Sequence, residues 1–304
     1  MIKNNFTHLC AVGDSFMFGE ELIETHYADQ FQEYSAAELR NFGYSSSGIT
    51  GSKYQNDLDK FMSLLDEVRF TSLLAKKFNL KHLNYAVGGA SQESIKFQAM
   101  LLMDYLKKNK INPADTLWLV GLTMPTRLSF LKDPVIGQFP VLNNNAIQYT
   151  WSRQTSQTFF SDNSVPNNSN FDEEFSKGLI VNLSNTEIFV SWAMNIIDTI
   201  NLMKVNNVGK FLVVNLFTSR LPSFQVEVPN RITKELLTSW ATNEIRHNIV
   251  PGQSVGLDTI LNMLGTQCPK GHPNDEGNRR IANYLFRHLT RQSVDAQTII
   301  DESK

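Results

Sequence analysis

The chain has 304 residues, of which 41% are apolar and 19% charged, with a formal net charge of -2 at pH 7. This composition is ordinary for a soluble globular protein. The small net charge, and the lack of a basic patch with interleaved aromatic residues, argue against a nucleic-acid-binding or membrane-surface protein. The length accommodates one large α/β domain with insertions, or two small domains.

Two cysteines are present, Cys10 and Cys268. Neither lies in a CxxC or Cys/His spacing, so we expect no disulfide framework, no metal site and no cofactor. The first residues lack the apolar core of a signal peptide, and no apolar run approaches the roughly 18 residues of a transmembrane helix. We therefore expect a cytoplasmic protein with no membrane partner. Export by another route, such as incorporation in a virus particle, would leave no signal of this kind.

In the first half of the chain, short apolar runs alternate with helical periodicity. The run 9–12 predicts a buried strand that ends at Gly13, and a helix start is expected after Ser15. Residues 26–60 are polar and irregular. The elements predicted next are a helix over 61–78, a strand over 81–87, a helix over 92–108 and a strand over 116–121.

Residues 132–178 interrupt this alternation, because they are rich in Asn, Ser, Gln and Pro with scattered aromatic residues. We interpret them as an inserted segment, with a small hairpin around 146–153, that serves as a lid or a substrate-binding subregion. The elements predicted beyond it are helices over 185–205, 257–264 and 274–289 and a strand over 210–217, with 218–270 otherwise loop and short helix.

Short buried strands that alternate with helices indicate a parallel sheet covered on both faces. The sequence therefore predicts a three-layer α/β/α sandwich, with a flavodoxin-like parallel sheet of about five strands and insertions. In such sheets, ligands bind outside the carboxyl ends of the strands. Turns that follow the predicted strands are thus the first places to look for chemistry.

Three such places carry reactive or flexible residues. They are Gly13-Asp14-Ser15 after the first strand, Gly88-Gly89 after the second, and Gly271-His272-Pro273-Asn274 before the last helix. A neutral His272 is a suitable base for the Ser15 hydroxyl. The backbone N–H groups of Ser15 and Gly89 are suitable donors to an oxyanion. The alternative for Ser15 is a turn residue that merely caps a helix.

These three blocks resemble those of the SGNH hydrolases, also called GDSL-type esterases and lipases. Gly13-Asp14-Ser15-Phe16 with Gly19 and Leu22 is similar to the nucleophile block, Asn84 to Ser91 to the glycine block, and Gly271 to Gly277 to the final block. The resemblance implies a single domain over 1–304, with Ser15 as nucleophile, His272 as base and Gly89 as an oxyanion donor.

Two family positions differ in this chain. The family has an oxyanion Asn after its third strand, where this sequence has Thr123, with Arg127 as a charged alternative nearby. A loop held by Thr and Arg hydrogen bonds explains these two residues equally well. The family also has an Asp three residues before the His, where this sequence has Pro269. Either His272 works without an acid, in a Ser–His dyad, or Asp258 reaches it from upstream.

The function expected from the residues and the resemblance is a serine ester hydrolase. A polar insertion with aromatic residues such as Tyr149, Trp151 and Phe159 favours a carbohydrate O-acetyl or acyl ester over a lipid. The alternative is a weakly active or non-catalytic binding or structural protein on the same scaffold. A nucleotide-binding protein ranks last, since no phosphate-binding glycine motif follows a strand. The expected partner is a small-molecule or glycan ester, and the sequence leaves the oligomeric state open.

Overall fold

The computed structural model describes residues 6–19, 21–22, 28–31, 52–88, 90–123, 127–131, 148–152, 157–160, 185–216, 249–251, 256–268 and 271–290. Of these, 28, 52–58, 127–131, 148–152, 157–160 and 185–189 are described by their backbone alone.

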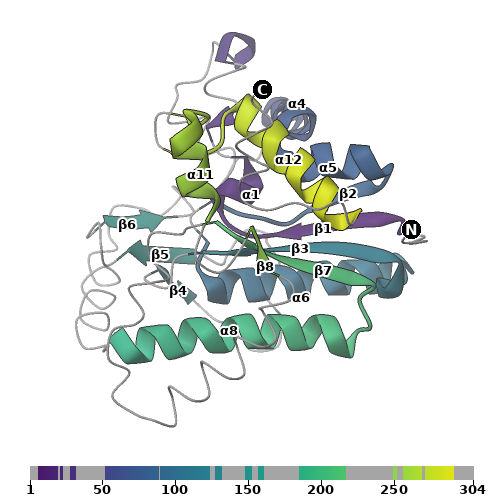
Figure 1. Cartoon of the computed structure of the whole chain (residues 1–304), viewed down its shortest axis with the longest axis vertical. Helices are drawn as coiled ribbons and strands as arrows, with labels where there is room; N and C mark the ends of the chain where they lie inside the picture. The colour runs from purple at the N-terminus through teal and green to yellow at the C-terminus, as the bar shows by residue number, and fades with distance from the viewer. Residues whose placement is uncertain are drawn as a thin grey trace.

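The central sheet has five strands, all parallel, in the order β2-β1-β3-β7-β8 (Figure 1). The strands are β1 (His8–Val12), β2 (Lys81–Asn84), β3 (Thr116–Leu122), β7 (Lys210–Asn215) and β8 (Ile249–Val250). Numbered along the chain, this order is 2-1-3-4-5, the flavodoxin-like order. The prediction of a three-layer α/β/α fold with about five parallel strands is confirmed.

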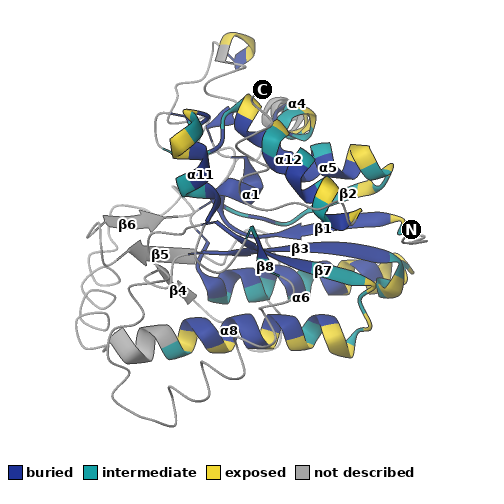
Figure 2. Cartoon of the chain, in the orientation of Figure 1, coloured by how far each residue is buried: buried dark blue, intermediate teal, exposed yellow. Residues whose placement is uncertain are grey.

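Helices cover both faces of this sheet (Figure 1). On one face, α6 (Gln92–Lys108) packs beside α8 (Asn185–Val205), and on the other α5 (Phe70–Phe78) packs beside α12 (Asp275–Leu289). The short helix α11 (Leu257–Leu264) contributes to the core of the second face. Strands β1 and β3 are buried along their whole length, whereas the edge strand β2 is half-buried or exposed (Figure 2).

Successive residues of a strand point to opposite faces, so each strand supplies both cores. The core beneath α5 and α12 takes from β1 and β3 the side chains of Leu9, Ala11, Leu117 and Leu119. The core against α6 takes the residues between them, Cys10, Val12, Trp118 and Val120. This double burial explains why these strands are continuous apolar runs rather than alternating ones.

A smaller antiparallel sheet joins β4 (Arg127–Leu131), β5 (Gln148–Ser152) and β6 (Gln157–Phe160) in that order. The hairpin predicted around 146–153 is therefore displaced along the chain. The first strand of the observed hairpin is β5, which fills most of the predicted range, and the connection from β5 to β6 comes after Ser152. Most of the inserted segment 132–178 lies outside the described residues, so its role as a lid stays a prediction.

The remaining predicted elements that the structure describes are present, with corrections to their bounds. The strand predicted over 81–87 ends at Asn84, and residues 52–60, predicted as irregular, belong to a helix. Residues 217–248 lie outside the described residues. The helix predicted over 61–78 is two helices, α4 (Ser52–Val68) and α5, separated by Arg69 in an extended conformation. Strand β8 falls in a region predicted as loop and short helix. Short elements complete the described chain: α1 (Ser15–Phe18), η1 (Ala28–Phe31) and η2 (Pro113–Asp115).

Within the described part of the chain, no helix combines the length and the apolar character needed to cross a bilayer.

Candidate active site

The carboxyl ends of β1 and β3 lie side by side, and between them the strand order of the sheet reverses. In doubly wound sheets this reversal opens a crevice at which ligands bind. Ser15 lies two turn residues beyond β1, and Thr123 directly follows β3. The fold therefore places Ser15 at the position where a ligand is expected.

Ser15 is the first residue of α1, a helix of four residues. Asp14 caps this helix, because its Oδ1 accepts a hydrogen bond of 3.1 Å from the Phe16 N–H. A Cβ on Gly13 would come within 2.3 Å of the Met17 side chain, so only glycine allows the chain to turn this tightly after β1. Gly19 ends the helix in the left-handed region, with φ of 91°.

His272 lies in a tight turn before α12. The turn is closed by hydrogen bonds from the Cys268 N–H to the His272 carbonyl, 2.7 Å, and from the Asn274 N–H to the Thr266 carbonyl, 3.0 Å. The Asn274 side chain then caps α12 by accepting from the Gly277 N–H. The base is thus held by backbone bonds on one side and by a capped helix on the other.

Ser15, His272 and Glu21 form a continuous hydrogen-bonded series. The Ser15 Oγ lies 2.8 Å from His272 Nε2, and His272 Nδ1 lies 2.7 Å from Glu21 Oε2. An ionised carboxylate only accepts, so Nδ1 carries the ring proton and Nε2 accepts from the serine hydroxyl. This is the tautomer that a general base for Ser15 requires.

The surroundings of these groups exclude water from most of their surface. The side chains of His272 and Glu21 are 13% and 3% exposed, and Ser15 is also buried. Glu21 Oε2 accepts a second hydrogen bond, 3.3 Å long, from the His272 backbone N–H. The Phe16 ring packs against the imidazole with 5.3 Å between centroids. A buried carboxylate is tolerated only when paired in this way, so Glu21 and His272 fix each other's position.

Asp258 does not occupy the place beside His272 that the sequence suggested. Its carboxylate Oδ1 accepts from the backbone N–H of Thr259 at 2.7 Å, in the first turn of α11. Its backbone carbonyl accepts from the Gln267 side chain. The partner of His272 Nδ1 is Glu21, six residues beyond the serine.

The hydroxyl of Thr123 is directed at another group of the site. It donates a hydrogen bond of 2.9 Å to Asp14 Oδ2, and the Thr123 N–H donates to Gln92 Oε1 at 3.3 Å. A hydroxyl has one hydrogen to donate, so Thr123 orients the capping Asp14 in this arrangement. That Thr123 donates to the oxyanion stays a prediction. Its hydroxyl would have to give up the hydrogen bond to Asp14 and donate to the oxyanion instead.

The other two predicted binding residues are described only in part. Arg127 begins β4, and its side chain lies outside the described residues. Gly89 also lies outside them, so its role as an oxyanion donor stays a prediction. The N–H of Ser15 makes no hydrogen bond to any residue that the structure describes, and it is therefore available for this role.

Among the described residues, no three His, Cys, Asp or Glu side chains are placed to hold a metal ion together.

Comparison with known proteins returned no matching family model and no matching curated protein. One of the solved structures that match is similar over 96% of this chain and 70% of its own, at 14% sequence identity and a TM-score of 0.39. It is described as a carbohydrate esterase whose active site displays divergent catalytic and non-catalytic binding functions. We infer function below from the site geometry and the sequence.

Proposed function

We propose that this protein is a serine ester hydrolase in which Ser15 is the nucleophile, His272 the general base and Glu21 the residue that positions His272. One observation carries the proposal: a buried serine at a strand end lies 2.8 Å from an imidazole whose other nitrogen is 2.7 Å from a buried carboxylate. The three sequence blocks and the flavodoxin-like strand order support an SGNH-type hydrolase.

In the first half of the reaction, the Ser15 Oγ attacks the ester carbonyl carbon while its proton passes to His272 Nε2. The carbonyl oxygen becomes an oxyanion. Collapse of this intermediate breaks the bond to the alcohol oxygen, which takes the proton from His272 Nε2 and leaves. Glu21 stays ionised and stabilises the imidazolium that exists between the two transfers.

In the second half, water attacks the acyl–Ser15 ester and gives its proton to His272 Nε2. The Ser15 Oγ leaves and recovers this proton, and the carboxylic acid departs. We propose the backbone N–H groups of Ser15 and Gly89 as the donors to the oxyanion. Each such donor is worth roughly 3 to 4 kcal/mol in known hydrolases.

We further propose that the alcohol part of the substrate is a carbohydrate. The support is the sequence of 132–178, in which aromatic residues are scattered among Asn, Ser and Gln instead of forming a continuous apolar lid. Flat apolar rings with polar neighbours suit sugar rings better than acyl chains.

The test of the reaction is Ser15→Ala, measured by hydrolysis of p-nitrophenyl acetate and by thermal unfolding. We expect turnover to disappear and the melting temperature to stay close to that of the wild type, because the substitution removes a single heavy atom, the Ser15 Oγ, and leaves the rest of the core unchanged. His272→Ala should lose as much activity. Equal rates in wild type and Ser15→Ala would contradict the proposal and leave a binding protein on this scaffold.

The substrate class is tested separately with acetylated oligosaccharides and with long-chain p-nitrophenyl esters. We expect Ser15-dependent release of acetate from the sugars and little turnover of a palmitate ester. The opposite preference would assign the protein to the lipases and leave the Ser15–His272 chemistry in place.

A further inference from the structure

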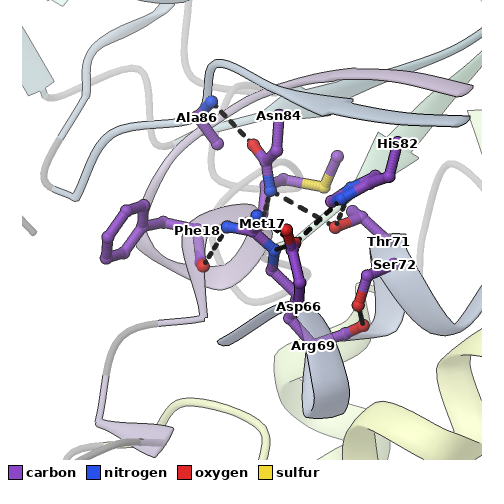
Figure 3. A network of polar contacts seen from close by, with 9 residues as sticks. All are labelled: Met17, Phe18, Asp66, Arg69, Thr71, Ser72, His82, Asn84 and Ala86. Carbon is purple, nitrogen blue, oxygen red and sulfur yellow. Dashed lines mark hydrogen bonds and ion pairs between the residues drawn. The ribbon is translucent and has the colours of Figure 1, made fainter. Parts of the chain in front are cut away.

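The helix that carries Ser15 is too short to hold itself in place. A helix leaves its last carbonyl groups without partners of its own, and in a helix of one turn these are most of the carbonyls. In α1, two residues from outside the helix take this role (Figure 3). The Asn84 Nδ2 donates to the Met17 carbonyl at 2.8 Å, and the Arg69 Nη1 donates to the Phe18 carbonyl at 3.3 Å.

These two donors are connected to each other through a series of side chains, most of them buried or part-buried (Figure 3). The Asn84 Nδ2 also lies 3.3 Å from the Thr71 hydroxyl, which lies 3.0 Å from His82 Nε2. His82 Nδ1 lies 3.0 Å from Asp66 Oδ1, and the same oxygen accepts from Arg69 Nε at 2.9 Å and from its Nη2. We call these five residues the junction network.

The proton positions in the junction network are mutually consistent. The carboxylate of Asp66 accepts, so His82 donates to it through Nδ1 and accepts from Thr71 through Nε2. Thr71 in turn accepts from Asn84. Each hydrogen bond of the network then has one defined donor and one defined acceptor. The series of bonds runs from the Met17 carbonyl, which accepts from Asn84, to the Phe18 carbonyl, which accepts from Arg69. Networks of this kind hold their members more rigidly than isolated pairs.

Arg69 is placed for this contact at a structural cost. It interrupts the run of helix between α4 and α5 with φ and ψ of -69° and 142°. Its side chain is 3% exposed, whereas that of its partner Asp66 is 47% exposed. Removing a cation from water costs several kcal/mol, and a half-exposed carboxylate returns only part of that. If Arg69 only stabilised the fold, an apolar residue at this position would do so without the cost of burying a charge.

The residue next to Arg69 reaches the other half of the candidate site. The Phe70 N–H, at the start of α5, donates to Asn278 Oδ1 on α12 at 2.8 Å. The Asn278 Nδ2 donates to the Pro273 carbonyl at 3.0 Å, beside His272. Two consecutive residues, Arg69 before α5 and Phe70 at its start, are therefore linked to the helix of Ser15 and to the turn of His272.

We propose that this α4–α5 junction, Arg69 and Phe70, aligns the serine with the histidine, and that Arg69 is a positioning residue for catalysis. The inference rests on the proposed function for its kinetic part. Glycine at position 19 leaves room for Arg69 to pack against the end of α1, because a Cβ on residue 19 would lie 3.2 Å from the Arg69 Cβ. A displacement of about 1 Å in such a pair of groups is enough to lower a rate by a large factor.

The primary variant is Arg69→Lys, which keeps the positive charge beside Asp66 but cannot bind Asp66 and the Phe18 carbonyl with a planar fork. We expect kcat for p-nitrophenyl acetate to fall about tenfold, with KM within about twofold of the wild type. Arg69→Gln should lower kcat further. The matched control is Arg280→Lys, since Arg280 pairs with Glu276 along α12. We expect this control to leave kcat unchanged.

A second control separates position from stability. Leu289→Ala removes a buried side chain at the far end of α12, about 20 Å along the helix from its start. It should unfold at a lower temperature than the wild type and keep its kcat when assayed well below that temperature. A kcat loss in Leu289→Ala equal to that in Arg69→Lys would overturn the positioning role.

Hydrogen exchange tests the junction without any substrate. The amides of Phe18 and Gly19 close α1, through bonds to the Asp14 and Ser15 carbonyls. We expect both to exchange about tenfold faster in Arg69→Lys than in wild type and Arg280→Lys. Unchanged exchange overturns the inference, whether or not the protein is an esterase. Faster exchange with unchanged kcat overturns the link to catalysis, and a wild type without turnover contradicts the proposed function alone.

Discussion

Glu21 has a left-handed backbone, with φ of 70°, which is uncommon for a residue other than glycine. Such a conformation costs about 1–3 kcal/mol and persists only where neighbouring contacts impose it. Among the described residues, such contacts include the two hydrogen bonds from His272 to the Glu21 carboxylate. The strain at Glu21 is consistent with a side chain placed for function.

The sequence contained no usable signal for Glu21. Residues advance by about 100° each along a helix, so a helix that continued past Gly19 would place residue 21 about 120° around its axis from Ser15. Helix α1 instead stops after one turn at Gly19, and Glu21 itself has a left-handed backbone. Sequence reasoning could identify Ser15 and His272, which lie at a strand end and before a helix, but the backbone conformation of such a short segment has no periodic pattern.

At the scale of single residues, Glu21→Gln should lower kcat by about 10³-fold or more, because the amide permits the wrong tautomer of His272. Asp258→Asn should change kcat only slightly, since the partner of His272 Nδ1 is Glu21. Steady-state kinetics with p-nitrophenyl acetate checks both variants. A strong loss in Asp258→Asn together with a weak one in Glu21→Gln would reverse this assignment.

At the scale of elements, the apolar periodicity was sufficient where packing alone decides the structure. Helices α6, α8 and α11 and the central strands follow it, because a buried face repeats along each of them. It failed at Arg69, which is extended and donates a hydrogen bond to the Phe18 carbonyl of α1, although the apolar spacing continues from α4 into α5. It also failed at β8, since the two residues Ile249 and Val250 are too short a strand to show a period.

The end of α1 gives a prediction for stability. Gly19→Ala should reduce the free energy of unfolding by about 1–3 kcal/mol for the backbone, and by more because its Cβ would lie 3.1 to 3.3 Å from Leu22, Arg69 and Leu65. Gly265→Ala is the matched control. Gly265 ends α11 with φ of 63°, and among the described residues no atom outside its own stretch of chain lies within 4 Å of its Cβ position.

Urea unfolding at 25 °C measures both glycine variants. We expect Gly19→Ala to lose more stability than Gly265→Ala, and we expect only Gly19→Ala to lower kcat. If the two variants lose the same free energy, crowding by Arg69 and its neighbours contributes nothing at Gly19.

At the scale of the whole molecule, the strand order determines where the chemistry gathers. Ser15 and Thr123 lie at the same edge of the sheet because β1 and β3 are adjacent parallel strands, and a parallel sheet brings its strand ends to one edge. This much follows from the alternation of strands and helices in the sequence. The hydrogen bond from Thr123 to Asp14 does not, because it depends on side-chain directions that a strand pattern leaves open.

Stability of the whole molecule should fall as the pH falls from about 7 toward 5. Burial lowers the pKa of His82; its hydrogen bond to Asp66 opposes this, and the charge of Arg69 adds to it. Burial also lowers the pKa of His8 and of His288. The unfolded chain, in which these groups have a pKa of about 6.5, then binds more protons than the folded one below that pH. Stability therefore rises with pH in this window.

His82 is the test of this pH dependence, because it lies inside the junction network. Protonation would place a second positive charge beside Arg69 and take away the acceptor for the Thr71 hydroxyl. Urea unfolding of wild type and His82→Gln at pH 7.5, 6.5 and 5.5 should give a smaller loss on acidification in the variant, which has no titrating ring at this position. Parallel curves for the two proteins would mean that His82 titrates alike in the folded and unfolded chain. In that case, the junction network would tolerate the proton, and acid destabilisation would have to come from other groups.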